Sequence, residues 1–225
     1  HSFRLDIIGC KMSSAWTTHV QKRNEEDEAM MSIRRVSYFA IGVCMFGAIT
    51  VSPPGSVGEA ATPAKAYFAG GCFWCMEEAF EKVEGVVSVV SGYMGGTVSD
   101  PTYEQVSAGR TGHAEAVEIN YDPSKVSYQK LLEAFWRNID PVTPNAQFCD
   151  HGSQYRSAVF YGTEEEQRLS EESRSTIERS KRFSAPIVTQ LVKASTFYPA
   201  EEYHQDYYKK NPVRYKYYKF SCGRA

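Results

Sequence analysis

Two cysteines, Cys72 and Cys75, lie between an apolar run and a segment with helical periodicity. The run Ala66-Tyr67-Phe68-Ala69 is followed by Gly70-Gly71, and the apolar residues after the cysteines recur at helical spacing: Met76, Ala79, Phe80 and Val83. The pattern predicts a strand, a glycine turn and a helix that begins near Cys72. A thiol in the first turn of a helix lies close to unpaired backbone N–H groups, which favour the thiolate and therefore nucleophilic attack.

The aromatic residues Phe73 and Trp74 add a flat apolar surface beside the Cys72 sulfur. The two preceding glycines allow the backbone to turn sharply and to approach a ligand closely. The alternative interpretation is that Cys72 is a buried structural thiol and that the aromatic residues belong to the core.

A carboxyl group that could donate a proton is Glu115. The residues from His113 to Tyr121 alternate in polarity, and Glu115 falls on the strand face that carries Val117 and Ile119. A carboxyl group on an apolar face loses its water, so we expect a raised pKa and proton donation near neutral pH. The alternative is a frayed strand end that leaves Glu115 in water.

Length and composition restrict the classes of function. The chain has 225 residues with 42% hydrophobic content, which suggests one domain with a sizeable core and some extensions. The net charge of −2 gives no electrostatic reason to expect a nucleic-acid partner. The six cysteines suit a redox enzyme better than a disulfide-stapled scaffold, and none of them has the double-pair spacing of a zinc site, so we expect no metal.

The first quarter of the chain predicts targeting rather than catalysis. Residues 1–30 lack periodicity and carry a charged cluster, so we interpret them as disordered or as an upstream extension of the true coding start. Residues 31–61 combine Arg34-Arg35, an apolar run and a small-residue end, the pattern of a secretory signal peptide. The run is shorter than the roughly 20 residues of a membrane span. We expect cleavage of the signal peptide near Ala60 or Ala61, which would leave a periplasmic or secreted enzyme that is not stably inserted in the membrane. The alternative is a cytoplasmic enzyme in which residues 31–61 do not act as a signal.

The catalytic domain is expected at residues 62–225, where strand and helix patterns alternate. Expected strands cover residues 66–69, 86–90, 113–121, 155–161 and 186–192, and expected helices cover residues 72–83, a short turn at Tyr103, and residues 128–136, 163–181 and 199–208. This order predicts an α+β fold, a two-layer sandwich with a mixed β-sheet of the ferredoxin-like, split βαβ kind. The aromatic and basic residues after Asn211-Pro212 are expected to form a mobile tail.

Six short blocks between about Tyr67 and His204 resemble the A-type peptide methionine sulfoxide reductases. The blocks are Gly71-Cys72-Phe73-Trp74, Ser91-Gly92-Tyr93, Pro101-Thr102-Tyr103-Glu104, Gly112-His113-Ala114-Glu115, Asp150-His151-Gly152-Ser153-Gln154-Tyr155-Arg156-Ser157 and Glu202-Tyr203-His204-Gln205. Several independent blocks in one order are far more specific than any one of them.

The resemblance implies reduction of methionine S-sulfoxide, free or in proteins, by thiol chemistry without a bound cofactor. Cys72 would attack the sulfoxide sulfur while Glu115 donates a proton to the sulfoxide oxygen. By the same resemblance, Tyr103 and Tyr155 would donate hydrogen bonds to that oxygen, and Asp150 would order the polar network. Phe73 and Trp74 would form an apolar pocket for the S-methyl group, and His204 would lie at the rim of this pocket.

The resemblance also implies a second, resolving thiol. It would condense with the sulfenic acid left on Cys72, and thioredoxin or a similar dithiol protein would reduce the resulting disulfide. In the best-known family pattern this cysteine lies in a glycine-rich C-terminal tail, which the present chain lacks. Cys222 is our first choice for the resolving cysteine because a mobile tail can bring it to Cys72. Cys75, three residues from Cys72, is the alternative. Cys149 is interpreted as structural.

Two other functions remain open. A general dithiol oxidoreductase would use Cys72 and Cys75 in the manner of thioredoxin, so that Cys75→Ser abolishes activity and Glu115→Gln has little effect. A binding module would use the aromatic surface to hold a peptide, or the cysteines to hold a metal, without chemistry. Zinc analysis and the activity of a Cys72→Ser variant separate the module from the enzymes.

Overall fold

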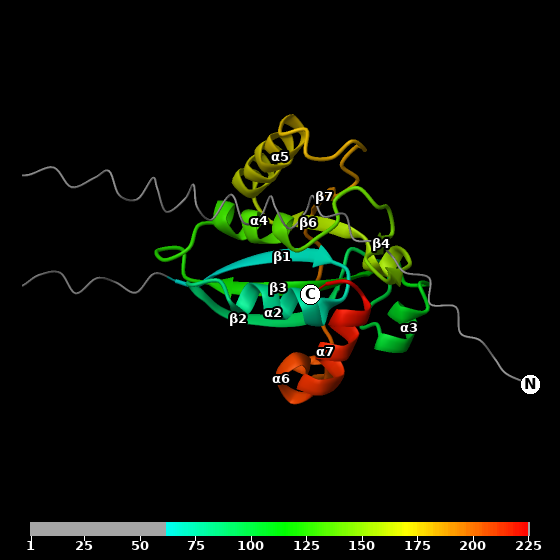
Figure 1. The fold of residues 1–225 in the computed structure, drawn as a ribbon. Helices are drawn as coiled ribbons and strands as arrows, with labels where there is room; N and C mark the ends of the chain where they lie inside the picture. Colours follow the sequence, from blue (N-terminus) through cyan, green and yellow to red (C-terminus); the bar gives the residue numbers. More distant parts are fainter. Residues whose placement is uncertain (1–61, 225) are drawn as a thin grey trace, which may run out of the picture. The chain divides into compact units, whose positions relative to one another are not determined.

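The computed structural model describes residues 62–224 (Figure 1), so the expected extension at 1–30 and the expected signal peptide at 31–61 lie outside the described residues. Among residues 62–224, no helix has both the length and the apolar character needed to cross a membrane. The strands are β1 Ala64–Gly70, β2 Val86–Met94, β3 Ala114–Tyr121, β4 Ala146–Gln147, β5 Asp150–His151, β6 Ser157–Tyr161, β7 Gln190–Lys193 and β8 Tyr198–Pro199. The helices are α2 Phe73–Glu81, α3 Tyr103–Ser107, α4 Tyr128–Arg137, α5 Glu164–Arg179, α6 Tyr207–Lys210 and α7 Pro212–Ser221, with 3-10 turns η1 Ser153–Tyr155 and η2 Glu202–His204.

A six-stranded mixed sheet forms the centre of this fold. Its strand order is β7-β6-β1-β3-β2-β8, and β4 and β5 form a separate two-stranded sheet. Strand β1 pairs antiparallel with both β3 and β6, so that Phe68 lies opposite Val117 on one side and Val159 on the other. Only β6 and β7 run parallel within the six-stranded sheet. The α+β class with a mixed sheet, predicted from the sequence, is confirmed.

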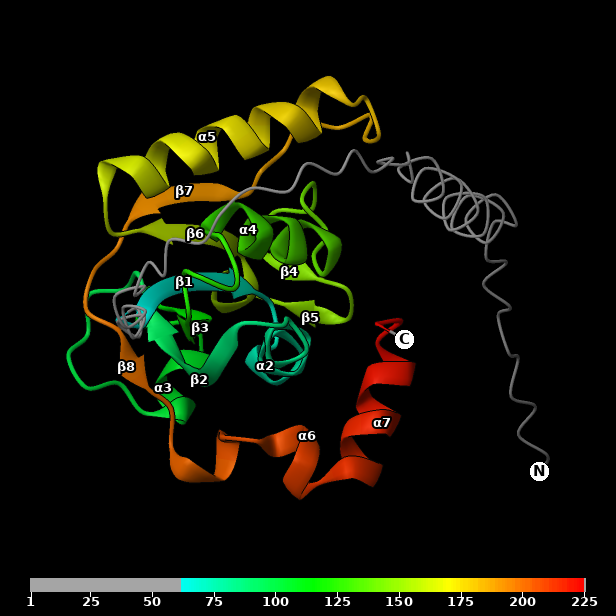
Figure 2. The same cartoon turned by 90° about the vertical axis from the view of Figure 1, so that its left-hand side faces the viewer.

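Helices α2, α4 and α5 cover one face of the sheet and share one apolar core with it (Figure 2). Phe68 of β1 is fully buried in this core, where its ring stacks on Phe80 of α2 and Phe135 of α4 at centroid distances of 5.2 Å each. The apolar stripe of α4, expected from Tyr128 to Trp136, therefore faces inward. A smaller cluster of alanines with Met94 and Phe160 lies on the other face of the sheet.

The Phe68 side chain is expected to be a main contributor to stability. Phe68→Ala removes a ring packed between two helices and leaves a cavity, so it should lower the free energy of unfolding by about 3–5 kcal/mol. Urea unfolding followed by circular dichroism measures this change. Val87→Ala is the control because Val87 is 65% exposed on β2, and this variant should change the free energy of unfolding by about 0.5 kcal/mol or less. Equal losses in the two variants would contradict this packing.

The segment from Pro199 to Tyr208 differs from the single helix expected there. Pro199 pairs with Gly92 in strand β8, η2 follows, and only then does the short helix α6 begin. Asp206 interrupts any continuous helix because its φ is 54°, in the left-handed region, and its backbone N–H donates a hydrogen bond to the Glu77 carboxylate at 3.0 Å. Tertiary contacts therefore override the local helical pattern.

The C-terminal segment, expected to be a mobile tail, is instead the helix α7. Pro212 occupies its first turn, where the missing N–H costs no hydrogen bond. On its inner face Tyr215 is buried and donates a hydrogen bond to Glu78 of α2 at 2.6 Å, while Lys219 forms an ion pair with the same carboxylate at 2.8 Å. These contacts fix α7 beside α2.

Candidate active site

Cys72 is the residue that immediately precedes helix α2, in the N-cap position. It follows a turn in which Gly71 has a φ of 78°, a conformation that favours glycine. A Cβ atom on Gly71 would also lie 2.5 Å from the Cβ atom of Gln147, so no side chain fits there. The Cys72 residue is only 5% exposed. The thiol therefore lies at a helix N-terminus, as predicted, but largely shielded from water.

This shielding reverses the effect that we expected on the Cys72 thiol. Burial disfavours the thiolate and raises the pKa of Cys72, and its contacts with Cys75 and Glu115 act in the same direction. The pKa of Cys75 falls to about 7, first because the Cys72 thiol donates a hydrogen bond to its sulfur and also because the Arg224 guanidinium is positive. The two sulfurs therefore share one negative charge near neutral pH.

Glu115 is the second residue of β3 and lies opposite Tyr93 of β2. The residue is 2% exposed, and its carboxyl oxygen Oε2 accepts a hydrogen bond from the Phe73 backbone N–H at 3.0 Å. Burial raises the pKa of Glu115 to about 8, although the Phe73 hydrogen bond opposes this shift. The carboxyl group is therefore protonated at neutral pH, as the face of its strand predicts.

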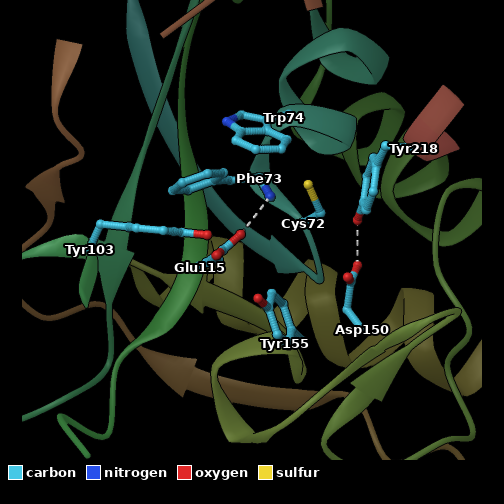
Figure 3. Close-up of a pocket in the computed structure, with 8 residues that line it drawn as sticks. All are labelled: Cys72, Phe73, Trp74, Tyr103, Glu115, Asp150, Tyr155 and Tyr218. Carbon is cyan, nitrogen blue, oxygen red and sulfur yellow. Dashed lines mark hydrogen bonds between the residues drawn. The ribbon is translucent and has the colours of Figure 1, made fainter. Parts of the chain in front are cut away.

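The Cys72 thiol and the Glu115 carboxyl lie in one pocket of about 140 Å³ (Figure 3). The pocket is lined by Cys72, Phe73, Trp74, Tyr103, Glu115, Asp150, Tyr155 and Tyr218. Seven of these eight residues are candidates from the sequence analysis, and Tyr218 is the addition. The pocket thus combines an apolar aromatic wall with a thiol, a protonated carboxyl and several phenol groups.

Tyr103 and Tyr155 bring their hydroxyl groups to the pocket from two different elements. Tyr103 begins α3, whose N-terminus is fixed by a capping box between Thr102 and Gln105, and Tyr155 ends η1. Burial raises the pKa of Tyr103 to about 12 and also raises that of Tyr155, with the Glu115 charge acting in the same direction. Both phenols therefore keep their protons and remain hydrogen-bond donors.

Removal of either hydroxyl group should slow the reaction without disturbing the fold. Tyr103→Phe and Tyr155→Phe each delete one donor that faces the pocket, so each should lower kcat by about 100-fold, the lower end of the cost of losing one donor to a developing negative charge. Steady-state kinetics with methionine sulfoxide, the substrate that the resemblance implies, measures the change. Tyr161→Phe on β6, outside the pocket lining, is the matched control and should keep the parent rate. A kcat for Tyr103→Phe or Tyr155→Phe equal to that of the control would contradict donation by that phenol.

Asp150 lies in β5, and its carboxylate accepts a hydrogen bond from Tyr218 of α7 at 2.6 Å (Figure 3). Tyr218 also acts to lower the pKa of the Cys72 thiol, against the effect of burial. Sequence reasoning missed Tyr218 because it treated the tail as mobile. The available signal was Pro212, a favourable helix start, followed by Tyr215 and Tyr218 at the spacing of one helix face.

His204 does not lie at the pocket rim, where the resemblance had placed it. It is 2% exposed and lies behind the aromatic wall, and its Nδ1 atom accepts a hydrogen bond from the Trp74 indole N–H at 3.2 Å. The Tyr207 ring also stacks on the indole, with ring centroids 3.8 Å apart. His204 thus supports the pocket from behind: its ring also packs on Phe73 and Tyr103, at centroid distances of 5.1 and 4.3 Å, because the chain turns at η2 and buries the imidazole.

Cys222, the first choice for the resolving thiol, is already bonded to Cys149 in a disulfide. Cys72 and Cys75 are both free thiols. The helical form of the tail explains the difference, because α7 ends at Cys222 beside the hairpin of β4 and β5 that carries Cys149. The spacing of cysteines in a sequence does not reveal which of them form disulfides, so nothing in the sequence indicated that Cys149 pairs with Cys222.

Two groups of potential metal ligands occur among residues 62–224, and neither is available to an ion. The first contains Asp150 with Cys149 and Cys222, whose disulfide removes both thiolate ligands. The second contains Glu77, Glu81 and Asp206. The Lys209 ammonium group lies 2.6 Å from Glu81 and 2.8 Å from Asp206, so it already pairs with two of these three carboxyl groups.

Comparison with known proteins points to one family. The family described as peptide methionine sulfoxide reductase matches residues 64–225. A peptide methionine sulfoxide reductase MsrA of Halalkalibacterium halodurans is 54% identical over 160 residues, which cover 71% of this chain and 91% of that protein. The MsrA of Listeria innocua is 50% identical over 161 residues, covering 72% and 91% respectively.

Solved structures agree with these sequence matches. The reduced form of Mxr1 from Saccharomyces cerevisiae has a TM-score of 0.63 at 31% identity and covers 67% of this chain and 87% of that one. Methionine sulfoxide reductase A of Corynebacterium diphtheriae has a TM-score of 0.60 at 31% identity, covering 71% and 78% respectively.

Proposed function

The chain belongs to the peptide methionine sulfoxide reductase family, and we propose that Cys72 and Glu115 carry out its reaction together in the pocket of Figure 3. The chain is a peptide-methionine (S)-S-oxide reductase, an oxidoreductase that reduces methionine S-sulfoxide to methionine. One observation carries the assignment of roles: a free thiol and a protonated carboxyl group line the same small pocket.

In the first step the Cys72 sulfur attacks the sulfoxide sulfur, and Glu115 donates its proton to the sulfoxide oxygen. The sulfur–oxygen bond of the substrate breaks as a sulfur–sulfur bond forms to Cys72, and the protonated oxygen leaves as hydroxide. Hydroxide then attacks the Cys72 sulfur, the sulfur–sulfur bond breaks, methionine leaves, and Cys72 becomes a sulfenic acid. The electron pair comes from the thiol, so this step needs no external reductant. The Cys75 sulfur lies in the same buried cluster and has a pKa lowered to about 7, so it can receive the proton of the Cys72 thiol.

The walls of the pocket suit the two ends of a sulfoxide group. Phe73 and Trp74 form an apolar surface for the S-methyl group, and Trp74 is held by His204 and Tyr207. The Tyr103 and Tyr155 hydroxyl groups belong to the same pocket (Figure 3) and would stabilise the oxygen as negative charge develops on it.

In the second step Cys75 resolves the sulfenic acid. Its sulfur attacks the Cys72 sulfur, water leaves, and a disulfide joins the two residues. The two are free thiols in one buried cluster, which supports this choice, whereas Cys222 is bonded to Cys149. A thioredoxin-like dithiol protein would then restore both thiols by disulfide exchange and become oxidised itself.

Cys75→Ser tests the second step separately from the first. The variant should still release one equivalent of methionine per enzyme and should accumulate Cys72 sulfenic acid, because no adjacent thiol remains to condense with it. Quantification of methionine and trapping of the sulfenic acid with dimedone, read by mass spectrometry, measure both. A Cys72–Cys222 disulfide found in the parent enzyme after one turnover would contradict the role of Cys75.

The stereochemistry of the substrate provides the test of the proposed reaction as a whole. Each epimer of a blocked methionine sulfoxide is incubated separately with the enzyme and dithiothreitol. We expect consumption of the S form alone, and no consumption by Cys72→Ser. Reduction of the R form at a similar rate, or activity of the Cys72→Ser variant, would contradict the assignment.

For location, we propose that residues 31–61 direct export and are removed near Ala60 or Ala61. The support is the order of the basic pair, the apolar run and the small residues in the sequence. Mass spectrometry of the N-terminus of the protein from its native cell gives the test. A mature protein that begins near residue 61 is the expected result, and a retained segment 31–61 would contradict export.

A further inference from the structure

Arg224, beyond the end of α7, contacts the turn that leads into Cys72. Its Nη2 atom donates a hydrogen bond to the Gly70 carbonyl oxygen at 2.6 Å. A Cβ atom on Gly71 would lie 2.6 Å from the same nitrogen, so the absence of a side chain there makes room for the guanidinium. The guanidinium carbon also lies 4.5 Å from the centre of the Phe148 ring.

The Cys149–Cys222 disulfide joins the two segments that meet at this guanidinium. Phe148 directly precedes Cys149, and Arg224 follows Cys222 by two residues. The Arg224 backbone N–H donates to the Lys219 carbonyl oxygen at 3.0 Å, so the chain folds back on α7 at this point. The disulfide therefore restricts where the Arg224 side chain can lie.

Arg224 also supplies a positive charge that no carboxylate among residues 62–224 neutralises within ion-pair distance. It lowers the pKa of both Cys75 and Glu115. The other charged or titratable groups that face the thiol pair are Glu78 of α2, Tyr103 of α3, Glu115 of β3, Asp150 of β5, Tyr155 of η1, and Tyr215, Tyr218 and Lys219 of α7. Lys219 is paired with Glu78, which leaves Arg224 as the cation without a carboxylate beside the thiols.

We propose that Arg224, tethered by the Cys149–Cys222 disulfide, is a positioning residue that fixes the Gly70-Gly71 turn and places a positive charge beside the Cys72–Cys75 pair. The charge favours the deprotonated pair from which the reaction starts, and the hydrogen bond to Gly70 holds the backbone that orients the Cys72 sulfur. The inference rests on the proposed function in that it takes Cys72 as the nucleophile.

The test measures thiol ionisation directly and needs no sulfoxide. In the full chain, with the Cys149–Cys222 disulfide intact, the rate of alkylation of Cys72 and Cys75 by iodoacetamide is followed against pH by mass spectrometry. Arg224→Gln removes the charge and keeps a donor, so the alkylation midpoint should move upward and the rate at pH 7 should fall by about 3- to 10-fold. Arg224→Lys keeps the charge and should restore the parent profile.

Lys216→Gln is the matched control, because it removes one positive charge from an exposed position on α7, the helix that precedes Arg224. It should leave the alkylation midpoint unchanged. An unchanged midpoint in Arg224→Gln, or equal shifts in Arg224→Gln and Lys216→Gln, would overturn the proposal. If Arg224→Gln does not fold, the same comparison is made with Arg224→Met, for which the same outcomes hold.

The tether is tested with the double variant Cys149→Ser/Cys222→Ser. Its alkylation midpoint should shift in the same direction as that of Arg224→Gln, and adding Arg224→Gln to it should produce little further shift. A parent-like midpoint in the double variant would overturn the tether. If instead all midpoints behave as expected but the enzyme fails to reduce the S-sulfoxide, the proposed function fails and the role of Arg224 in thiol ionisation stands.

Discussion

Cys72→Ser is expected to abolish methionine sulfoxide reduction, with kcat/KM lower than that of the parent enzyme by more than about 10⁴-fold. A serine hydroxyl is a far weaker nucleophile than a thiolate and cannot take the oxygen atom as a sulfenic acid does. Consumption of the S epimer with dithiothreitol as reductant measures the loss. Because Cys72 is small and lies at the start of α2, a serine should fit, and thermal unfolding by circular dichroism checks that the fold is kept.

Cys75 gives the comparison that makes the Cys72 result specific. Both thiols are free and buried, so a nonspecific effect of losing a thiol would appear in either serine variant. Only Cys72→Ser should prevent the release of the first equivalent of methionine. Release of that equivalent by Cys72→Ser would transfer the nucleophile to another cysteine and contradict the account.

Glu115→Gln is expected to lower kcat by about 10²- to 10⁴-fold, the usual contribution of a positioned proton donor. The amide matches the carboxyl group in size and can still accept the Phe73 N–H hydrogen bond, but it has no acidic proton to give. Steady-state kinetics on the S epimer, with thermal unfolding as a check, measures the effect. A general dithiol oxidoreductase that uses Cys72 and Cys75 would lose little, so this variant separates the two functions.

The control for this substitution lies on the same strand. Glu118 of β3 has the same side chain, but it pairs with Lys65 at 2.9 Å and accepts a hydrogen bond from Tyr67, away from the pocket. Glu118→Gln should therefore keep nearly the parent kcat. Parallel losses in the two variants would indicate that β3 is disturbed and that Glu115 has no special role.

Local sequence patterns were sufficient to place the central pair of groups. The strand–glycine–helix pattern placed Cys72 at the start of α2, and period-two alternation placed Glu115 on a buried strand face. The raised pKa of Glu115 was one of two interpretations of that strand, and the family resemblance favoured it over a frayed strand end. These features depend on neighbours in sequence or on one strand, which is why a single sequence reveals them.

Features that depend on contacts distant in sequence were not predictable in the same way. The Cys72 pKa reflects burial by several elements, and this burial outweighs the helix terminus. The pairing of Cys149 with Cys222 joins residues 73 positions apart, and it requires the hairpin of β4 and β5 to lie beside the end of α7. Neither contact leaves a periodic signal in the chain.

The most direct test of the central claim is the single-turnover rate of methionine formation from the S epimer, measured against pH in the parent enzyme and in Glu115→Gln. The pKa of Glu115 is raised to about 8, so its proton is present below that pH and is lost above it. The account predicts a parent rate that declines above about pH 8, and a Glu115→Gln rate that is low and lacks this decline. The same alkaline decline in Glu115→Gln, or a parent-like rate in that variant, would contradict proton donation by Glu115.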